Sequence, residues 1–380
     1  MQRHYNYIIA GAGAGGLSLA YNLTESSFSN LRILVLDGDP KNKNDRTWSW
    51  WEKGEGSFDS ILENQFRGIQ FHSSHHSKLM TADPYSYKMI RSQPFYDRCK
   101  KAIADCAHID FITHNVTHIE EVDDLVHVRA GAEAYTTDYL LKSFPTEQLN
   151  YSDSLYVSQH FGGWYIKTDN PQFDPDVATF MDFRIHQKDD TRFFYVLPIS
   201  EHEALVEIAV FSNDILKPEN YDVLIKDYIS EYLFWEEYQI TEREYGVIPM
   251  TNYPFWNHNT ARVYNLGTYG GAVKPSSGYA FSRILRHADR IAASISSGKP
   301  LSSSYDTFKR RFLLYDETLL DVLLLQKKSG ADIFSNLFQH NEAPAIFSFL
   351  DGDTTLKEEI RIFSRMPKVP FIKGFFRQLG

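Results

Sequence analysis

The chain has 380 residues, more than a typical single domain, so we expect either two intertwined domains or one large domain with a satellite. Its formal net charge of −10 argues against a nucleic-acid partner, because phosphate-binding surfaces carry a basic excess. Aromatic residues make up 15% of the chain, which is typical of a large apolar cavity and equally of an ordinary aromatic core.

Cysteine usage and hydropathy indicate the compartment. The two cysteines, Cys99 and Cys106, lack the companions that a zinc site or a disulfide framework requires, so we expect a reducing cytoplasm. The first residues run directly into a predicted strand, and we expect no export by a cleaved signal. The sequence has no apolar run of the roughly 18 residues needed to cross a bilayer, so any membrane contact is expected to be peripheral.

The start of the chain predicts a dinucleotide-binding unit. Residues 5–10 predict a buried strand, residues 11–16 a glycine-rich turn and residues 17–23 a helix. A second strand over residues 31–36 ends at Asp37. This order and spacing are typical of a Rossmann-like unit, and the alternative is a glycine-rich turn with a purely structural role.

Each conserved feature of such a unit has a physical reason that this sequence satisfies. Gly11 permits the tight turn, Gly13 lets the backbone approach a pyrophosphate, and Gly16 lets the helix pack closely on the strand. The positive end of the helix dipole then faces the phosphates. Asp37 is placed to bind a ribose hydroxyl.

A histidine-rich hairpin follows. Residues 68–72 and 78–80 predict two short strands around a polar tip. His72, His75 and His76 resemble a set of metal ligands, but no carboxylate or cysteine is placed to complete a site. A solvated hairpin tip is therefore the favoured interpretation, and we assign no metal.

The remaining elements alternate between two sheets. Residues 93–106 predict a helix, and residues 109–112 and 116–128 predict strands that return to the nucleotide-binding sheet. A separate antiparallel sheet is predicted from strands over residues 179–183, 193–197 and 204–211. The later pattern predicts, in order, a helix over 221–232, a strand over 263–267, a helix over 281–295 and a helical segment beyond Ser304.

Three further stretches make the sequence resemble the lycopene cyclase family of carotenoid biosynthesis. Residues 45–51 read Asp-Arg-Thr-Trp-Ser-Trp-Trp, and residues 194–198 lead to the segment Ala-Leu-Val-Glu that ends at Glu207. Residues 267–279 are similar to the second flavin-contacting loop of that family. Related segments run from Gly11 to about residue 315, and bacterial members of the β-cyclase type are the most similar.

The resemblance implies an activity and its cofactors. The family closes the linear ψ-ends of lycopene, or of a related acyclic carotenoid, into β-ionone rings without net redox change. It requires reduced FAD, with NAD(P)H as the electron donor. It also implies catalytic residues: Glu207 as the acid, and Asp182 as a second acid or a pocket organiser. Besides the glycines and acid of the first unit, it implies a cofactor-binding set of Arg46, Gly270, Gly271, Ser277 and Gly278.

The residues around Glu207 favour the same role. Along residues 204–211 the positions that share a face with Glu207 are apolar, and so are those on the opposite face. A glutamate there is either an edge residue that reaches water or an acid in a closed pocket, where desolvation raises its pKa and keeps a proton available. Cyclising an isolated alkene needs such a proton donor.

Three tryptophans of the first stretch are candidates for the substrate pocket. Trp48, Trp50 and Trp51 offer electron-rich faces to an apolar chain or a carbocation, although plain core packing explains each of them equally well. Ile208 and Ala209 differ from the family, which has an acid or tyrosine and then threonine after its catalytic glutamate.

Two other functions compete with this one. A flavin monooxygenase shares the opening unit, but those enzymes carry a Gly-Asp-Ala segment where residues 265–269 have no aspartate. A non-catalytic carotenoid binder would have kept the fold and lost turnover, and the residues at 208 and 209 are its only support.

The last residues predict how a protein without a membrane span could collect an apolar substrate. Residues 366–377 contain Val369, Phe371, Ile372, Phe375 and Phe376 together with three cations and no acid. This composition is typical of peripheral docking to an anionic lipid surface, and the alternative is that the segment packs back on the preceding helices.

The predicted fold class is α/β: a Rossmann-like FAD/NAD(P)-binding domain interrupted by an antiparallel β-sheet substrate domain, with a helical C-terminus. The expected FAD-binding parts are residues 1–70, 95–160 and 255–300. The substrate domain is expected to comprise a hairpin over 71–94 and a sheet over 161–254, and the helical segment spans 301–380.

Overall fold

The computed structural model describes residues 3–305, 310–325, 330–364, 366, 371, 374–375 and 377. The first sheet has the strand order β8-β2-β1-β11-β10-β9, with β17 paired to β11. Its strands are β1 (Arg3–Ala10), β2 (Ile33–Asp37), β8 (Ile109–Thr113), β9 (Val116–Val122), β10 (Leu125–Ala130), β11 (Glu133–Lys142) and β17 (Val263–Asn265). The predicted strands of the nucleotide-binding sheet are therefore confirmed, and the core strands β8, β2, β1, β11 and β17 run parallel.

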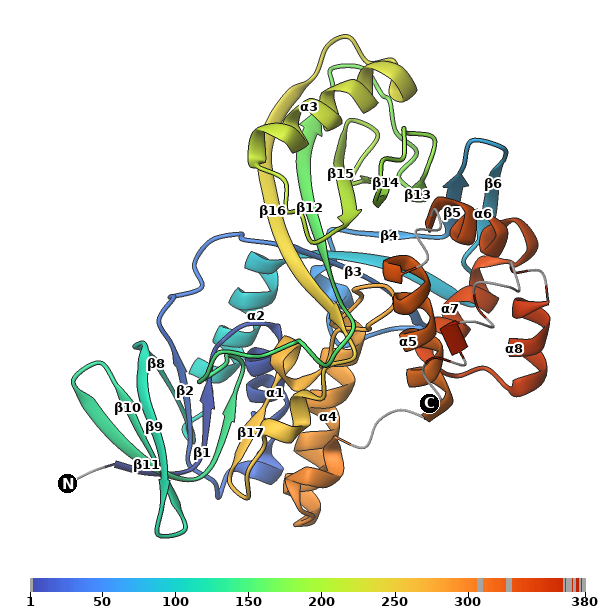
Figure 1. The fold of residues 1–380 in the computed structure, drawn as a ribbon. Coiled ribbons are helices and arrows are strands. Elements are labelled where there is room, and N and C mark those ends of the chain that lie inside the picture. Colours follow the sequence, from blue (N-terminus) through green and yellow to red (C-terminus); the bar gives the residue numbers. More distant parts are fainter. Residues whose placement is uncertain are drawn as a thin grey trace.

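Three helices pack together beside this sheet: α1 (Ala14–Asn22), α2 (Ser92–Ala104) and α4 (Phe281–Ser297). They bury an apolar layer in which Leu17 and Leu19 of α1 meet Phe95 of α2 and Ile291 of α4. Figure 1 shows α1, α2 and α4 grouped beside the blue and teal strands. The α-helices predicted here are confirmed, although α1 begins at Ala14 directly after the glycine turn.

The second sheet is the larger layer of the molecule, and its order is β16-β12-β15-β14-β13-β5-β6. Its strands are β5 (Gly68–His72), β6 (Ser77–Thr81), β12 (Tyr156–Lys167), β13 (Val177–Asp182), β14 (Thr191–Pro198), β15 (Glu203–Phe211) and β16 (Gln239–Thr251). It is antiparallel except that β13 and β5 run parallel, which the sequence did not predict. The predicted hairpin over residues 68–80 forms the edge of this sheet.

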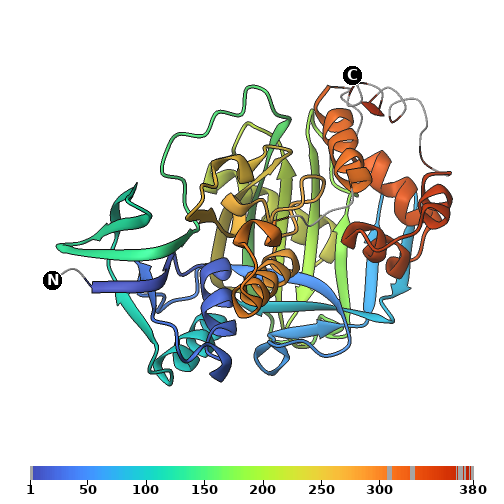
Figure 2. The same ribbon diagram turned by 90° about the horizontal axis from the view of Figure 1, so that it is seen from below.

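Helices cover the two faces of the large sheet. Helix α3 (Pro218–Tyr228), which continues into a π-helical turn over Ile229–Leu233, buries Tyr221, Ile225 and Tyr228 against β12, β14 and β15. The opposite face packs against the C-terminal helices α5 (Arg310–Leu325), α6 (Gly330–His340), α7 (Ala343–Asp351) and α8 (Leu356–Phe363). In Figure 2 these orange and red helices lie beside the edge of the sheet that is formed by β5 and β6.

A small third sheet connects the two layers. It has the order β3-β7-β4, with β3 (Thr47–Lys53), β4 (Asn64–Phe66) and β7 (Tyr85–Arg91). No strand was predicted for residues 47–53, because their tryptophans were interpreted only as pocket or core residues. Trp50 and Trp51 are buried, on the side of the nucleotide-binding layer and of the large sheet respectively.

The segment that is predicted to dock to a membrane, residues 366–377, is only partly described by the structure. Within the described residues, none of the helices is both long and apolar enough to span a bilayer. Of the predicted lipid anchors, Val369, Ile372 and Phe376 lie outside the described residues. Among those that are described, Phe371 and Phe375 are half-buried.

Candidate functional site

The glycine turn between β1 and α1 has the geometry that its residues predict. Gly11 has φ +103°, which other residues rarely adopt. A Cβ atom on Gly16 would lie 1.9 Å from the carbonyl oxygen of Gly11, so helix and strand approach each other only because Gly16 has no side chain. Both glycines are therefore required by the fold itself.

Gly13 differs from these two glycines. It caps α1 with an extended backbone, and a Cβ atom built on it would meet nothing within 4 Å. Asp37 lies beside the turn, where its carboxylate accepts hydrogen bonds from the backbone N–H groups of Ala12 and Asp39. Open space in front of a helix N-terminus, with an acid at the next strand end, fits a dinucleotide pyrophosphate and ribose.

The second loop of the predicted cofactor site packs directly on this turn. A Cβ atom on Gly15 would lie 3.0 Å from the backbone nitrogen of Gly267, so the loop that carries Gly270 and Gly271 adjoins α1. Gly271 and Gly278 have φ values of +77° and +74°.

Ser277 and Arg46 complete the predicted cofactor-binding set. Ser277 is buried, and its hydroxyl has no hydrogen-bond partner among the described residues. Arg46 follows β2 on the connection to β3, and its exposed guanidinium lies 3.5 Å from the Asp45 carboxylate. A buried hydroxyl without a partner among the described residues and an exposed guanidinium both fit a phosphorylated cofactor.

A buried ion pair that the sequence did not reveal anchors this second loop to α5. The Lys274 Nζ atom lies 2.7 Å from the Asp316 carboxylate, and both side chains are 6% exposed. Ser276 donates its hydroxyl to the same carboxylate. The signal that was missed is an isolated lysine in a glycine-rich loop, which has no partner close to it in sequence.

We predict that Asp316→Ala lowers the free energy of unfolding by about 3–5 kcal/mol, because it leaves the Lys274 ammonium buried without its partner. Flavin content should fall as well, since the loop loses its anchor. Urea denaturation and absorbance of the bound cofactor measure the two effects. The control is Lys167→Met, which breaks a surface pair with Glu203 and should cost less than about 1 kcal/mol. Equal losses in the two variants would contradict the anchoring role.

Glu207 lies in the middle of the large sheet, on the face that packs toward the C-terminal helices. Its strand neighbours on that face, Leu205 and Ala209, belong to the apolar core formed with these helices. Glu207 itself is half-buried, so part of its surface remains accessible to a solvent-sized molecule. The surrounding protein atoms still raise the pKa of its carboxyl well above the ordinary value, because burial disfavours the charged form. The alternative of an edge-strand glutamate is excluded, because β15 lies between β12 and β14.

A second carboxyl, Glu244 on β16, lies beside Glu207. Gly163 on the intervening strand β12 pairs with Glu207 on one side and with Glu244 on the other. The register places both side chains on the same face of the sheet, and Thr47 donates its hydroxyl to the Glu244 carboxylate at 2.8 Å. Sequence reasoning missed Glu244 because residues 239–251 were not predicted as a strand.

Aromatic side chains surround this acid pair. Tyr195 pairs with Glu207 in the sheet, and its hydroxyl lies 3.2 Å from that of Tyr279, which also lies 3.3 Å from the hydroxyl of Tyr87. The ring of Tyr279 stacks on Phe180 and meets Trp51 edge-on. Because Tyr279 ends the second cofactor loop, this aromatic cluster links that loop to Glu207 through Tyr195.

The structure does not bring Asp182 together with Glu207. A bulge in β13 turns Asp182 to the opposite face of the sheet, where it pairs with Phe194 in register. There its carboxylate binds the Arg184 guanidinium and accepts the hydroxyl of Tyr228 from α3 at 2.8 Å. The expected second acid or pocket organiser is therefore an ion-paired residue outside the pocket of Glu207.

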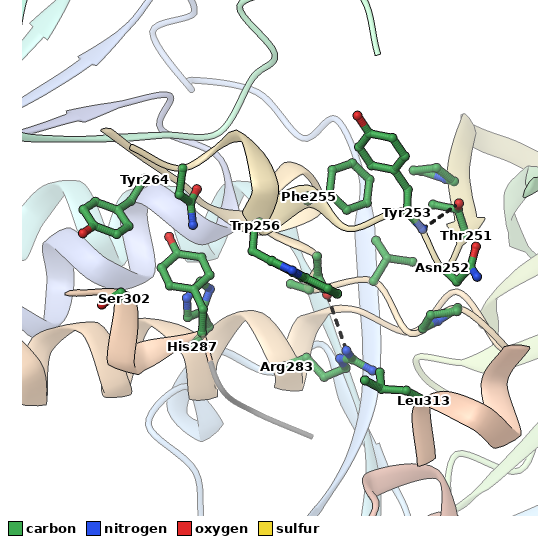
Figure 3. A pocket seen from close by; sticks show the side chains of 18 of the residues that line it. Thr251, Asn252, Tyr253, Phe255, Trp256, Tyr264, Arg283, His287, Ser302 and Leu313 are labelled. Atoms are coloured by element: carbon green, nitrogen blue, oxygen red, sulfur yellow. Dashed lines mark hydrogen bonds between the residues drawn. The ribbon is translucent and has the colours of Figure 1, made fainter. Parts of the chain in front are cut away.

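A cavity of about 560 Å³ lies on another side of the cofactor loop. Figure 3 shows Arg283 and His287 of α4 facing Trp256 and Tyr264 across it. Gly270 and Gly271 border this cavity, whereas Glu207 and Glu244 do not line it. This cavity is therefore separate from the site of the two carboxyls.

Comparison with known proteins identifies the family. A model of the lycopene cyclase proteins matches residues 6–374. The chain belongs to the lycopene cyclase family. It is 24% identical over 399 residues to the lycopene beta-cyclase of Pantoea ananas, with 98% of this chain and 97% of that protein covered. It is 25% identical over 209 residues to the lycopene beta-cyclase of Pseudescherichia vulneris, covering 51% of this chain and 52% of the relative.

Solved structures extend the likeness to flavin-dependent enzymes. A geranylgeranyl bacteriochlorophyll reductase-like protein from Thermoplasma acidophilum superposes with a TM-score of 0.66 at 13% identity, covering 98% of this chain and 99% of that one. A flavin-dependent brominase superposes with a TM-score of 0.63 at 13% identity, covering 99% and 98%. The shared fold confirms the predicted Rossmann-like α/β class, and membership of the family makes the chain a cyclase-type enzyme.

Proposed function

We propose that this enzyme closes the linear ψ-ends of lycopene, or of a related acyclic carotenoid, into β-ionone rings, with Glu207 as the proton donor. One observation carries the proposal: the Glu207 carboxyl, whose pKa burial raises, pairs in the sheet with Tyr195, and the Tyr195 hydroxyl contacts Tyr279 at the end of the second cofactor loop. Membership of the lycopene cyclase family supports the substrate class.

The reaction needs only proton movements at the carbon chain. The O–H bond of Glu207 breaks as a C–H bond forms at the terminal double bond, and the resulting cation is attacked by a second double bond to close a six-membered ring. A ring C–H bond then breaks, and its proton returns to the carboxylate. No electrons are gained or lost, so the product is an isomer of the substrate. The rings of Tyr195, Tyr279 and Trp51 face this region and would stabilise the cation.

The proposed cofactor is FAD, held by Gly11, Gly13, Gly16 and Asp37 and by the loop with Gly270, Gly271, Ser277 and Gly278, with Arg46 near the phosphates. When bound in its reduced form, FAD would supply an electron-rich ring system that stabilises positive charge. Because the cyclisation itself consumes no electrons, NAD(P)H would serve only to keep the flavin reduced. The structural likeness to a flavin-dependent brominase supports the choice of cofactor.

We further propose that the enzyme is cytoplasmic and docks peripherally to the membrane, because its substrate is an apolar chain that partitions into lipid. The cations of residues 366–377 would each contribute about 1 kcal/mol at an anionic surface. Against this, Arg377 is ion-paired with Asp321 of α5, which favours a segment that packs back on the helices.

Deletion of residues 369–380 distinguishes these alternatives. If the segment docks, the truncated enzyme should keep its fold and flavin but stop co-sedimenting with anionic vesicles at low salt. Vesicles of neutral lipid are the control, since they should retain neither protein. Unchanged co-sedimentation with anionic vesicles would refute the docking role.

Anaerobic incubation with lycopene and chemically reduced FAD tests the activity itself. Cyclised product without oxygen supports the proposal. Product that forms only in air and carries oxygen would instead assign a flavin monooxygenase, and bound but unchanged pigment would assign a carotenoid binder.

A further inference from the structure

Two carboxyls lie on either side of strand β12, at a position where that strand has a glycine and therefore no side chain. Gly163 is the residue of β12 that pairs with both Glu207 and Glu244. A Cβ atom on Gly163 would lie 3.3 Å from the Glu207 Cβ atom and 3.4 Å from the Glu244 Cγ atom. The absence of that Cβ lets the two side chains meet above the strand.

The surroundings of the two acids differ, and the difference assigns the proton. Glu244 is 6% exposed and accepts the Thr47 hydroxyl at 2.8 Å. Burial raises the pKa of both carboxyls, but the Thr47 hydroxyl and the Arg91 guanidinium favour the charged form of Glu244, whereas the charge of Glu244 favours the protonated form of Glu207. Glu244 is therefore better supported as the carboxylate and Glu207 as the acid.

We propose that Glu207 and Glu244 share one proton, and that Glu244 is a positioning residue that keeps this proton on Glu207. This proposal rests on the proposed function. Two carboxylates on one face of the sheet, with only a glycine between them, cannot both ionise without strong repulsion, so the pair retains one proton at neutral pH. During ring closure the proton leaves Glu207 for the terminal alkene carbon. The later ring deprotonation restores it, so the pair ends as it began.

Other titratable and charged groups near Glu207 and Glu244 affect the pKa values of the two carboxyls. Arg91 of β7 stacks over the Tyr165 ring at 4.3 Å and pairs with Glu242. The remaining titratable groups that face the pair or Arg91 are Glu63, Tyr87, Tyr165 and Tyr195. Burial raises the pKa values of the three tyrosines, so they stay neutral while the carboxyl pair titrates.

The first test is the pH profile of the cyclase with Glu244→Gln. The amide keeps the size of the side chain, but the neighbouring negative charge is gone, so the pKa of Glu207 falls. The basic limb of the kcat profile should move to lower pH by about 1 unit or more. Glu244→Asp keeps the charge and should return the limb toward its parent position. A uniform loss of rate with an unmoved limb would overturn the proposal, because a purely structural glutamate has that effect.

The second test does not depend on turnover. Because the folded state holds the shared proton more tightly than the unfolded chain, its contribution to stability is present at low pH and is lost as pH rises through the raised pKa. The free energy of unfolding, measured between about pH 5 and about pH 9, should decline less with pH in Glu207→Gln and Glu244→Gln than in the parent. The control Glu203→Gln, on the same strand but in a surface pair with Lys167, should keep the parent slope.

The two tests separate this inference from the proposed function. A flattened slope in both variants of an enzyme that does not cyclise lycopene would support the pair and reject the function. Cyclisation combined with an unchanged slope and an unmoved limb would reject the pair alone. If Glu244→Gln does not fold, Gly163→Ala takes its place. Its added methyl group would lie 2.9 Å from the Leu205 side chain and 3.3 Å from the Glu207 Cβ atom, so Glu207 must shift relative to Glu244 and the slope should flatten; a parent-like slope would overturn the proposal.

Discussion

Replacing Glu207 with glutamine is expected to lower kcat for cyclisation by about 10²–10⁴-fold, the usual contribution of a general acid. The side chain keeps its shape and its place beside Glu244, but it no longer carries a transferable proton. Flavin content should not change, because Glu207 lies outside the glycine turn and the second loop. Product formation from lycopene under anaerobic conditions measures the effect.

The matched control for this variant is Glu203→Gln. Glu203 lies four positions earlier on β15 and pairs with Lys167 at the surface, where the Lys167 and Glu203 side chains are 53% and 40% exposed. Its loss should change kcat by less than about twofold, since surface pairs contribute little. A flavin-loaded Glu207→Gln enzyme with the rate of the control would mean that another group donates the proton.

Replacing Gly13 with valine is expected to abolish flavin binding while leaving the fold intact. The backbone at Gly13 has φ −78°, which valine adopts readily, and the new side chain would meet nothing within 4 Å in the protein. That same space is where a pyrophosphate must approach the N-terminus of α1. Absorbance of the purified protein gives the flavin content, and circular dichroism and thermal unfolding report on the fold.

Two companion variants make the result specific. Ala104→Val adds similar bulk at an exposed position near the end of α2 and should keep full flavin content. Gly16→Val should unfold the nucleotide-binding unit itself, because its Cβ would lie 1.9 Å from the Gly11 carbonyl oxygen. A folded Gly13→Val protein that retains its flavin would place the pyrophosphate elsewhere.

Much of the fold could be predicted because its signals are local. The strand, glycine turn and helix at the start depend on residues within about one turn of each other, and the same holds for the strands around Phe193 and Glu207. The parallel pairing of β13 with β5 could not be predicted, because it joins strands about a hundred residues apart. The bulge in β13 was missed for a similar reason, and it moved Asp182 to the opposite face of the sheet.

In the candidate site, too, residues with a local sequence signal could be predicted, and residues brought in by long-range strand pairing could not. Glu207 was identified because a single charged residue interrupts an apolar strand, which is visible in the sequence alone. Glu244 has no such signal, since charged residues surround it in the sequence and only the register through Gly163 brings it to Glu207. The tryptophans were left open between two roles, and Trp51 meets Tyr279 of the aromatic cluster while Trp50 packs on Phe281.

Cyclisation in D₂O follows the proton that Glu207 is proposed to deliver. The enzyme, lycopene and reduced FAD are incubated anaerobically in D₂O, and the product is examined by mass spectrometry. Since the carboxyl proton exchanges with solvent, the account predicts one deuterium for each ring closed and no oxygen. A cyclised product without deuterium, or one that contains oxygen, would contradict proton-initiated cyclisation.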